Sequence, residues 1–139
     1  TTEREIAVAA NSSVNVASGE SATLGGAAAM LTGGRTLTKT GAGTLALSGN
    51  KADATTAFTV QAGTLSIGDP LQLPAGGSPA LTLAGGTLAT TAVLSLPLAI
   101  TLTGNSTLDT GANAVTQANA ITGAFAGISW FFITKKRLA

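Results

Sequence analysis

Three aspartates in or beside the turns of this chain are its candidates for acid–base chemistry. Enzymes that hydrolyse glycosidic bonds use two carboxyl groups held at a defined separation. Asp53, Asp69 and Asp109 are 16 and 40 residues apart, which does not match the period described below, so we expect ordinary turn residues. The chain has no histidine and no cysteine, which removes the usual general base, the Ser-His-Asp triad and thiolate metal sites. The sequence therefore predicts no enzymatic activity, no metal site and no cofactor.

Aromatic and basic residues gather near the C-terminal end and form a candidate interface. Residues 130–132 are three of only five aromatics, and residues 135–137 are three of seven basic residues. The six residues are Trp130, Phe131, Phe132, Lys135, Lys136 and Arg137. Three interpretations stay open: a hydrophobic lid over the end of the fold, an exposed contact rich in aromatics, or docking on a membrane surface.

Two columns of apolar residues recur with a period of about 20 residues. They predict the strands and turns that position the aspartates and the C-terminal residues described above. The first column has steps of 21, 20, 23 and 20 residues and consists of Leu24, Leu45, Leu65, Leu88 and Leu108. The second has steps of 21, 21, 23, 19 and 21 residues and consists of Val16, Leu37, Phe58, Leu81, Ile100 and Ile121. A period of this length indicates short units that stack on one another to bury a shared core.

Alternating apolar and polar residues with glycine-rich turns between them predict strands with one buried face. We therefore expect an all-β parallel solenoid of about six coils of 20–23 residues, with equivalent strands about 4.8 Å apart. Residues 14–123 form the solenoid in this prediction. Residues 1–13 form a cap or edge segment, and residues 124–139 form the C-terminal lid or contact. Three of the four prolines lie within residues 68–79, which we expect to leave the ladder as a loop.

Composition excludes several classes of partner. Seven basic and six acidic residues give a net charge of +1, which provides no basic cluster for nucleic acid. The longest apolar stretch, residues 120–133, is interrupted by polar and glycine residues and is shorter than the ~18 residues expected of a membrane span. The chain begins Thr1-Thr2 without methionine, so we expect that a leader has been removed or that this is an excised fragment.

Residues 37–68 resemble a known repeat. Residues 37–49 read Leu-Thr-Lys-Thr-Gly-Ala-Gly-Thr-Leu-Ala-Leu-Ser-Gly, and residues 60–68 read Val-Gln-Ala-Gly-Thr-Leu-Ser-Ile-Gly. Both halves are similar to the autotransporter-associated β-strand repeat, also called the passenger-associated transport repeat. The resemblance implies a right-handed, single-stranded parallel β-helix in a secreted bacterial surface protein, and it carries no catalytic residues. We expect no outer-membrane barrel within these 139 residues, which is a departure from the family's pattern.

Three functions remain as hypotheses. The first is a structural or adhesive segment at the bacterial surface, in contact with neighbouring repeats, a host surface or glycans. The second is a filament subunit that polymerises end to end with other copies, because open coils present unpaired strand edges. The third is a carbohydrate-active enzyme on a β-helix, in which the Asp109→Ala variant would lose turnover.

Overall fold

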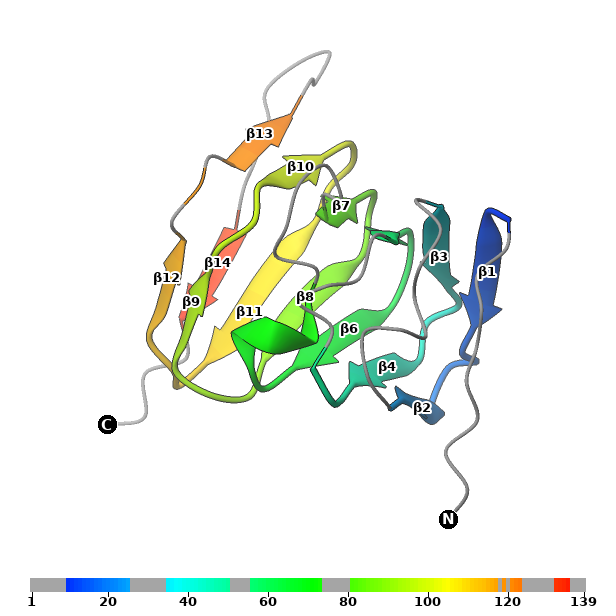
Figure 1. Ribbon diagram of the computed structural model, residues 1–139, viewed down its shortest axis with the longest axis horizontal. Helices are drawn as coiled ribbons and strands as arrows, with labels where there is room; N and C mark the ends of the chain where they lie inside the picture. The colour runs from blue at the N-terminus through cyan, green and yellow to red at the C-terminus, as the bar shows by residue number, and fades with distance from the viewer. Residues whose placement is uncertain are drawn as a thin grey trace.

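A computed structural model describes residues 10–25, 35–50, 56–73, 81–117, 119 and 121–123, together with the backbone of residues 132–135. Two six-stranded sheets face each other across a shared interior, and the chain passes from one to the other in each coil (Figure 1). The first sheet contains, in spatial order, β1 (Ser12–Asn15), β3 (Thr36–Thr40), β5 (Ala57–Val60), β7 (Leu81–Leu83), β10 (Ile100–Leu102) and β13 (Ile121–Gly123).

The second sheet contains the strand that follows in each coil. It is formed, in chain order, by β2 (Ser21–Leu24), β4 (Thr44–Leu47), β6 (Thr64–Ile67), β8 (Thr87–Thr90), β11 (Thr107–Gly111) and β14 (Phe132–Lys135). A third side carries a short 3-10 helix, η2 (Pro70–Gln72), and the two-stranded sheet of β9 (Leu94–Leu96) and β12 (Val115–Gln117). All of these strand pairs are parallel.

This arrangement confirms the predicted all-β parallel solenoid. Its coil count is slightly lower than the six we expected, at about four turns. Four coils, from β3–β4 to β10–β11, have a paired neighbour on both sides in both sheets. Strand pairing also exceeds the expected limits of the solenoid, because β1 begins at Ser12 and β14 extends to Lys135.

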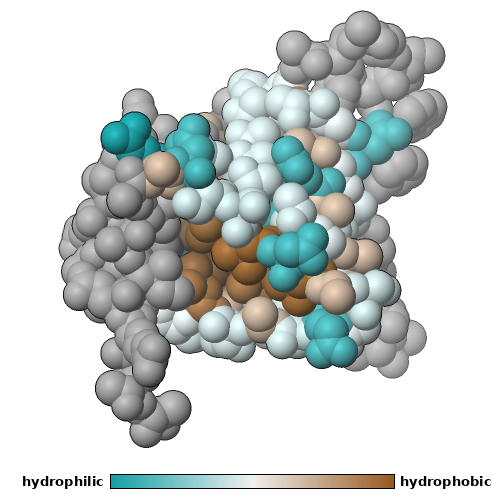
Figure 2. Space-filling model, turned by 90° about the vertical axis from the view of Figure 1, so that its right-hand side faces the viewer, coloured by the Kyte–Doolittle hydropathy of each residue, from teal (hydrophilic) through white to brown (hydrophobic). Residues whose placement is uncertain are grey.

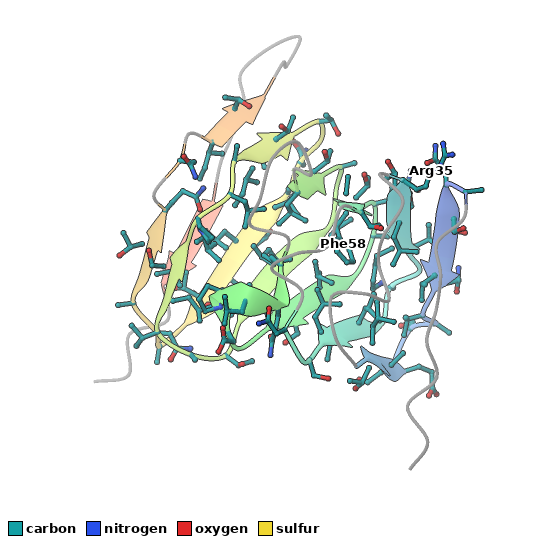
Figure 3. All side chains as sticks on the ribbon, in the orientation of Figure 1. Arg35 and Phe58 are labelled. Carbon is teal, nitrogen blue, oxygen red and sulfur yellow. The ribbon has the colours of Figure 1, made fainter. Side chains whose placement is uncertain are left out.

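Residues of like kind stack in columns inside the solenoid. Leu45, Leu65, Leu88 and Leu108 occupy paired positions in the second sheet, followed by the backbone position of Ile133. The first sheet stacks Leu37, Phe58, Leu81, Ile100 and Ile121 in the same way. All of these side chains are buried except Ile121, which is partly buried, and that of Ile133, which lies outside the described side chains. Phe58 points into the interior (Figure 3).

Two members of the predicted columns are in a different register. Leu24 pairs with Leu47, and Ala22 takes the position next to Leu45. Ser12, and not Val16, pairs with Leu37, and the Val16 amide donates to the carbonyl of Thr40 at the corner. Both Leu24 and Val16 are nevertheless buried. The displacement is two residues for Leu24 and four for Val16. An even displacement along a strand keeps a side chain on the same face, so apolar spacing alone did not distinguish these registers.

The N-terminal end of the stack has unpaired strand edges. Among the described residues, β1 and β2 each pair on one side only. Ser12, which occupies the position beside Leu37, is exposed. Figure 2 views the molecule from this end and shows apolar atoms near the centre beside more hydrophilic ones. The inner aliphatic side chains of this end are nevertheless buried, since Leu37 and Leu45 are 5% and 2% exposed.

Candidate functional site

The two described aspartates serve local backbone structure. Asp69 caps η2, where its Oδ1 accepts a hydrogen bond from the Leu71 amide at 2.8 Å. Asp109 Oδ1 accepts from the Gly111 amide at 2.9 Å. Asp53 lies outside the described residues. In the described parts of the chain, no three acidic, histidine or cysteine residues are grouped as a metal site would require.

Two columns of hydroxyl side chains line the outer faces of the solenoid. The first sheet carries Ser13, Thr38, Thr59, Thr82, Thr101 and Thr122 at successive paired positions. The second sheet carries Ser21, Thr44, Thr64, Thr87 and Thr107. Threonine suits these positions because its branched side chain packs on a pleated sheet while its hydroxyl remains polar. Each face therefore presents an uncharged hydroxyl every strand spacing, about 4.8 Å.

A shallow polar hollow interrupts the first of these faces near the N-terminal end. It has a volume of about 390 Å³ and is lined by Asn11, Ser12, Ser13, Thr38, Thr40 and Gln61. Its lining contains hydroxyl and amide groups and no charged side chain, so it can donate and accept hydrogen bonds to a neutral polar ligand.

A smaller hollow of about 200 Å³ lies beside η2 on the third side. Its lining residues are Gly49, Asn50, Asp69, Leu71 and Gln72. Part of the polar capacity of η2 is already used, because Gln72 Oε1 accepts from the amides of Gly68 and Asp69 and Asp69 Oδ1 caps the helix. This hollow therefore contains less hydrogen-bonding capacity than its residue types indicate.

Lys39 is the one buried charged side chain among the described residues. It points inward from β3 with 2% of its surface exposed. Its Nζ donates to the carbonyl oxygens of Thr40 at 2.9 Å, Gly41 at 2.8 Å and Ala62 at 3.0 Å. Burial lowers the pKa of the Lys39 ammonium below its ordinary value, because removal from water disfavours the charged form.

Most of the predicted C-terminal interface lies outside the described residues, namely Trp130, Phe131, Lys136 and Arg137. The backbone of Phe132 and Lys135 belongs to β14, which pairs with β11. Residues 132–135 therefore continue the second sheet. The choice between a lid, an adhesive contact and membrane docking remains a prediction for the other four residues. In the described part of the chain, no helix has the length and apolar character needed to cross a bilayer.

Comparison of the chain with known protein families, with curated proteins and with solved structures found no match. The resemblance of residues 37–68 to the autotransporter-associated repeat therefore rests on the residues themselves.

Sequence reasoning missed the burial of Lys39, although the signal was present. Strict alternation through Thr36–Thr40 places Lys39 on the same face as the buried Leu37. A lysine at an inward position indicates a specific set of acceptors in the interior, because an unpaired buried charge is very costly.

Proposed function

We propose that this chain is an extracellular structural and adhesive β-solenoid of a bacterial surface protein, similar to a segment of an autotransporter passenger. The observation that carries the proposal is that both halves of the repeat motif occupy equivalent places in the fold. Residues 37–49 run through β3, a corner and β4, and residues 60–68 run from the end of β5 through the next corner and β6. Threonine and leucine of the two halves then stack directly, as Thr44 on Thr64 and Leu45 on Leu65.

The surface chemistry supports a binding role and not a catalytic one. The described carboxylates of Asp69 and Asp109 cap local amides, whereas the outer faces present neutral hydroxyls in long columns. Neutral hydroxyl and amide groups recognise other neutral polar surfaces, such as glycans, through hydrogen bonds. The hollow beside β1, β3 and β5 adds amide groups to the hydroxyl column, so we assign adhesion to the face of the first sheet.

Binding of the purified chain to bacterial or host cells and to a glycan array tests adhesion. We expect the triple variant Thr38→Lys, Thr59→Lys and Thr82→Lys to lose binding, because three like charges disrupt a neutral contact face. The matched control carries Thr44→Lys, Thr64→Lys and Thr87→Lys on the second sheet, and it should bind as the wild type does. Adhesion is refuted if the unaltered chain binds neither cells nor glycans.

The genomic reading frame around this chain tests the surface assignment independently. We expect it to encode a secretion leader and an outer-membrane barrel, or to lie beside a gene for one. A reading frame that encodes a cytoplasmic multidomain enzyme on both sides would exclude the proposed location, whatever the outcome of the binding assays.

The N-terminal edge of the stack favours a second candidate, a subunit that polymerises end to end. Among the described residues, strands β1 and β2 pair on one side only, and their free edges are the features that a stacking neighbour would cover. Contact between opposite ends does not close on itself and so generates a filament. Electron microscopy and sedimentation over a concentration series would detect such fibres.

A charge introduced at the N-terminal end distinguishes a specific effect on filament formation from a general change in solubility. Ser12→Lys puts an inward-facing charge on the first strand, which blocks edge-to-edge pairing. Thr82→Lys adds the same charge to the side of the solenoid and is the control. Fibres that disappear only with Ser12→Lys support polymerisation, and a monodisperse wild type at millimolar concentration rules it out.

A further inference from the structure

The inner faces of neighbouring strands in this solenoid carry similar aliphatic residues. The apolar pattern therefore specifies the register of strand pairing only weakly. Inner positions two residues apart are both filled by aliphatic side chains, as with Leu81 and Leu83 in β7. A shift of two residues between neighbouring strands therefore still places aliphatic on aliphatic and keeps the outer residues outside. The pairing of Leu24 with Leu47, where equal spacing predicted Leu45, is such a shift.

Lys39 is the inner residue of β3 that makes these alternative registers unequal in energy. Its column continues with Val60, Leu83 and Leu102 on the following coils. Each of those residues can exchange aliphatic neighbours at small cost, but an ammonium group in the interior requires acceptors. Lys39 has three, and they belong to two different coils: Thr40 and Gly41 on its own corner, and Ala62 on the next.

The backbone around the ammonium is shaped for one position of the side chain. Gly63 lies directly over it, and a Cβ on that residue would be 2.8 Å from the Lys39 Nζ. Gly63 has a positive φ of 67°, which turns the corner at the residue after Ala62. A two-residue shift between β3 and β5 would displace the Ala62 carbonyl by about 6.6 Å along the strand, far beyond hydrogen-bond distance.

The later corners do not offer the same set of acceptors. In the corner between β7 and β8 the positive φ falls at Gly85, which is equivalent to Ala62 because Val60 pairs with Leu83. In the corner between β10 and β11 the Gly104 carbonyl already accepts from the hydroxyl of Ser106. In the described stack, a lysine therefore meets a matching set of carbonyl acceptors at one junction, that between β3 and β5.

We propose that Lys39 is the register-determining residue of this solenoid, which fixes the alignment of β3 with β5 by inserting its ammonium into the carbonyl cluster of Thr40, Gly41 and Ala62. The lysine acts by excluding shifted pairings, which would separate the buried ammonium from the Ala62 carbonyl, the one of its three acceptors that lies on the neighbouring coil. The aliphatic columns provide the stability of the stack, and Lys39 selects one alignment among those that the columns permit.

Engineered disulfides test this directly, because the natural chain has no cysteine. Thr38→Cys with Thr59→Cys places thiols at directly paired positions, whereas Thr36→Cys with Thr59→Cys can close readily only after a two-residue shift. Each pair is refolded from denaturant under mild oxidation, and the closure rates are compared by gel shift. In the presence of Lys39 we expect the paired thiols to close much faster than the shifted ones.

Lys39→Met should raise the relative closure rate of the shifted pair by roughly ten-fold or more, the discrimination expected from a hydrogen bond to a charged group. Leu83→Met, a methionine in the same column two coils further along, is the control and should leave the ratio unchanged. An unchanged ratio in Lys39→Met overturns the proposal. If Lys39→Met gives no β-sheet circular dichroism, Lys39→Gln is compared in its place, and failure of both to fold also overturns it, because the lysine would then supply stability and not selection.

Discussion

Substituting Gly63 by alanine should destabilise the solenoid through a clash between neighbouring coils. The residue has a φ of +67°, and an alanine in that left-handed conformation costs about 1–2 kcal/mol. The added Cβ would also lie 2.5 Å from the Gly41 carbonyl oxygen and closer still to that of Gly43. Relief of such overpacking costs a further ~1–3 kcal/mol, so we expect a total loss of about 2–5 kcal/mol in the free energy of unfolding.

Gly19→Ala is the matched control for the conformational part of this effect. Gly19 has a φ of +81°, and an added Cβ there would have no atom within 4 Å. Its variant should lose only the ~1–2 kcal/mol of the left-handed conformation. Urea unfolding followed by far-ultraviolet circular dichroism measures both variants. Equal destabilisation of Gly19→Ala and Gly63→Ala would refute the close packing of successive corners.

Three further predictions concern the interior. Leu65→Ala removes a fully buried side chain between two other leucines and should lower the free energy of unfolding by about 2–5 kcal/mol in urea titrations; a loss below ~1 kcal/mol would contradict the stacked column. Ser106→Ala removes the acceptor of the Gly85 amide, now 3.0 Å away, and should cost about 1–3 kcal/mol, with faster exchange of that amide in NMR; unchanged exchange would contradict it. Because burial lowers the pKa of Lys39, the folded state binds fewer protons than the unfolded state between the lowered pKa and the ordinary one, so stability should rise with pH in that window and remain flatter in Lys39→Met. The chain has no histidine, cysteine or tyrosine to obscure this window, and a wild-type slope no steeper than that of the variant would contradict the buried ammonium.

Sequence periodicity predicts the inner coils well because their spacing and their chemistry agree. From Leu37 to Ile121 and from Leu45 to Leu108 every expected partner is the observed one. Each of these strands except β13 has a neighbour on both sides in the described sheets, so a strand that buried its wrong face would lose packing at two interfaces. The described part of the proline-rich segment, residues 68–73, also leaves the ladder as expected, with η2 starting at Pro70.

Periodicity did not predict the register of the first coil or the polar contacts of the interior. Val16 and Leu24 satisfy the spacing and are buried, yet both lie in a register other than the expected one. Period-two reasoning assigns a face and not an alignment. The acceptors of Lys39 are backbone carbonyls, which every residue possesses, so no residue type in the sequence identifies them.

The outer hydroxyl columns have a consequence for how such a chain can change over generations. Because each inner coil presents nearly the same lateral chemistry as its neighbours, duplicating or deleting one whole winding by recombination would alter the length of the rod while preserving the character of its sides. The junction bridged by Lys39 and Ala62 is one place where such an exchange would separate a matched pair. The contact of the Gly85 amide with the Ser106 hydroxyl is another, so an exchange that leaves both junctions intact would disrupt the stack least.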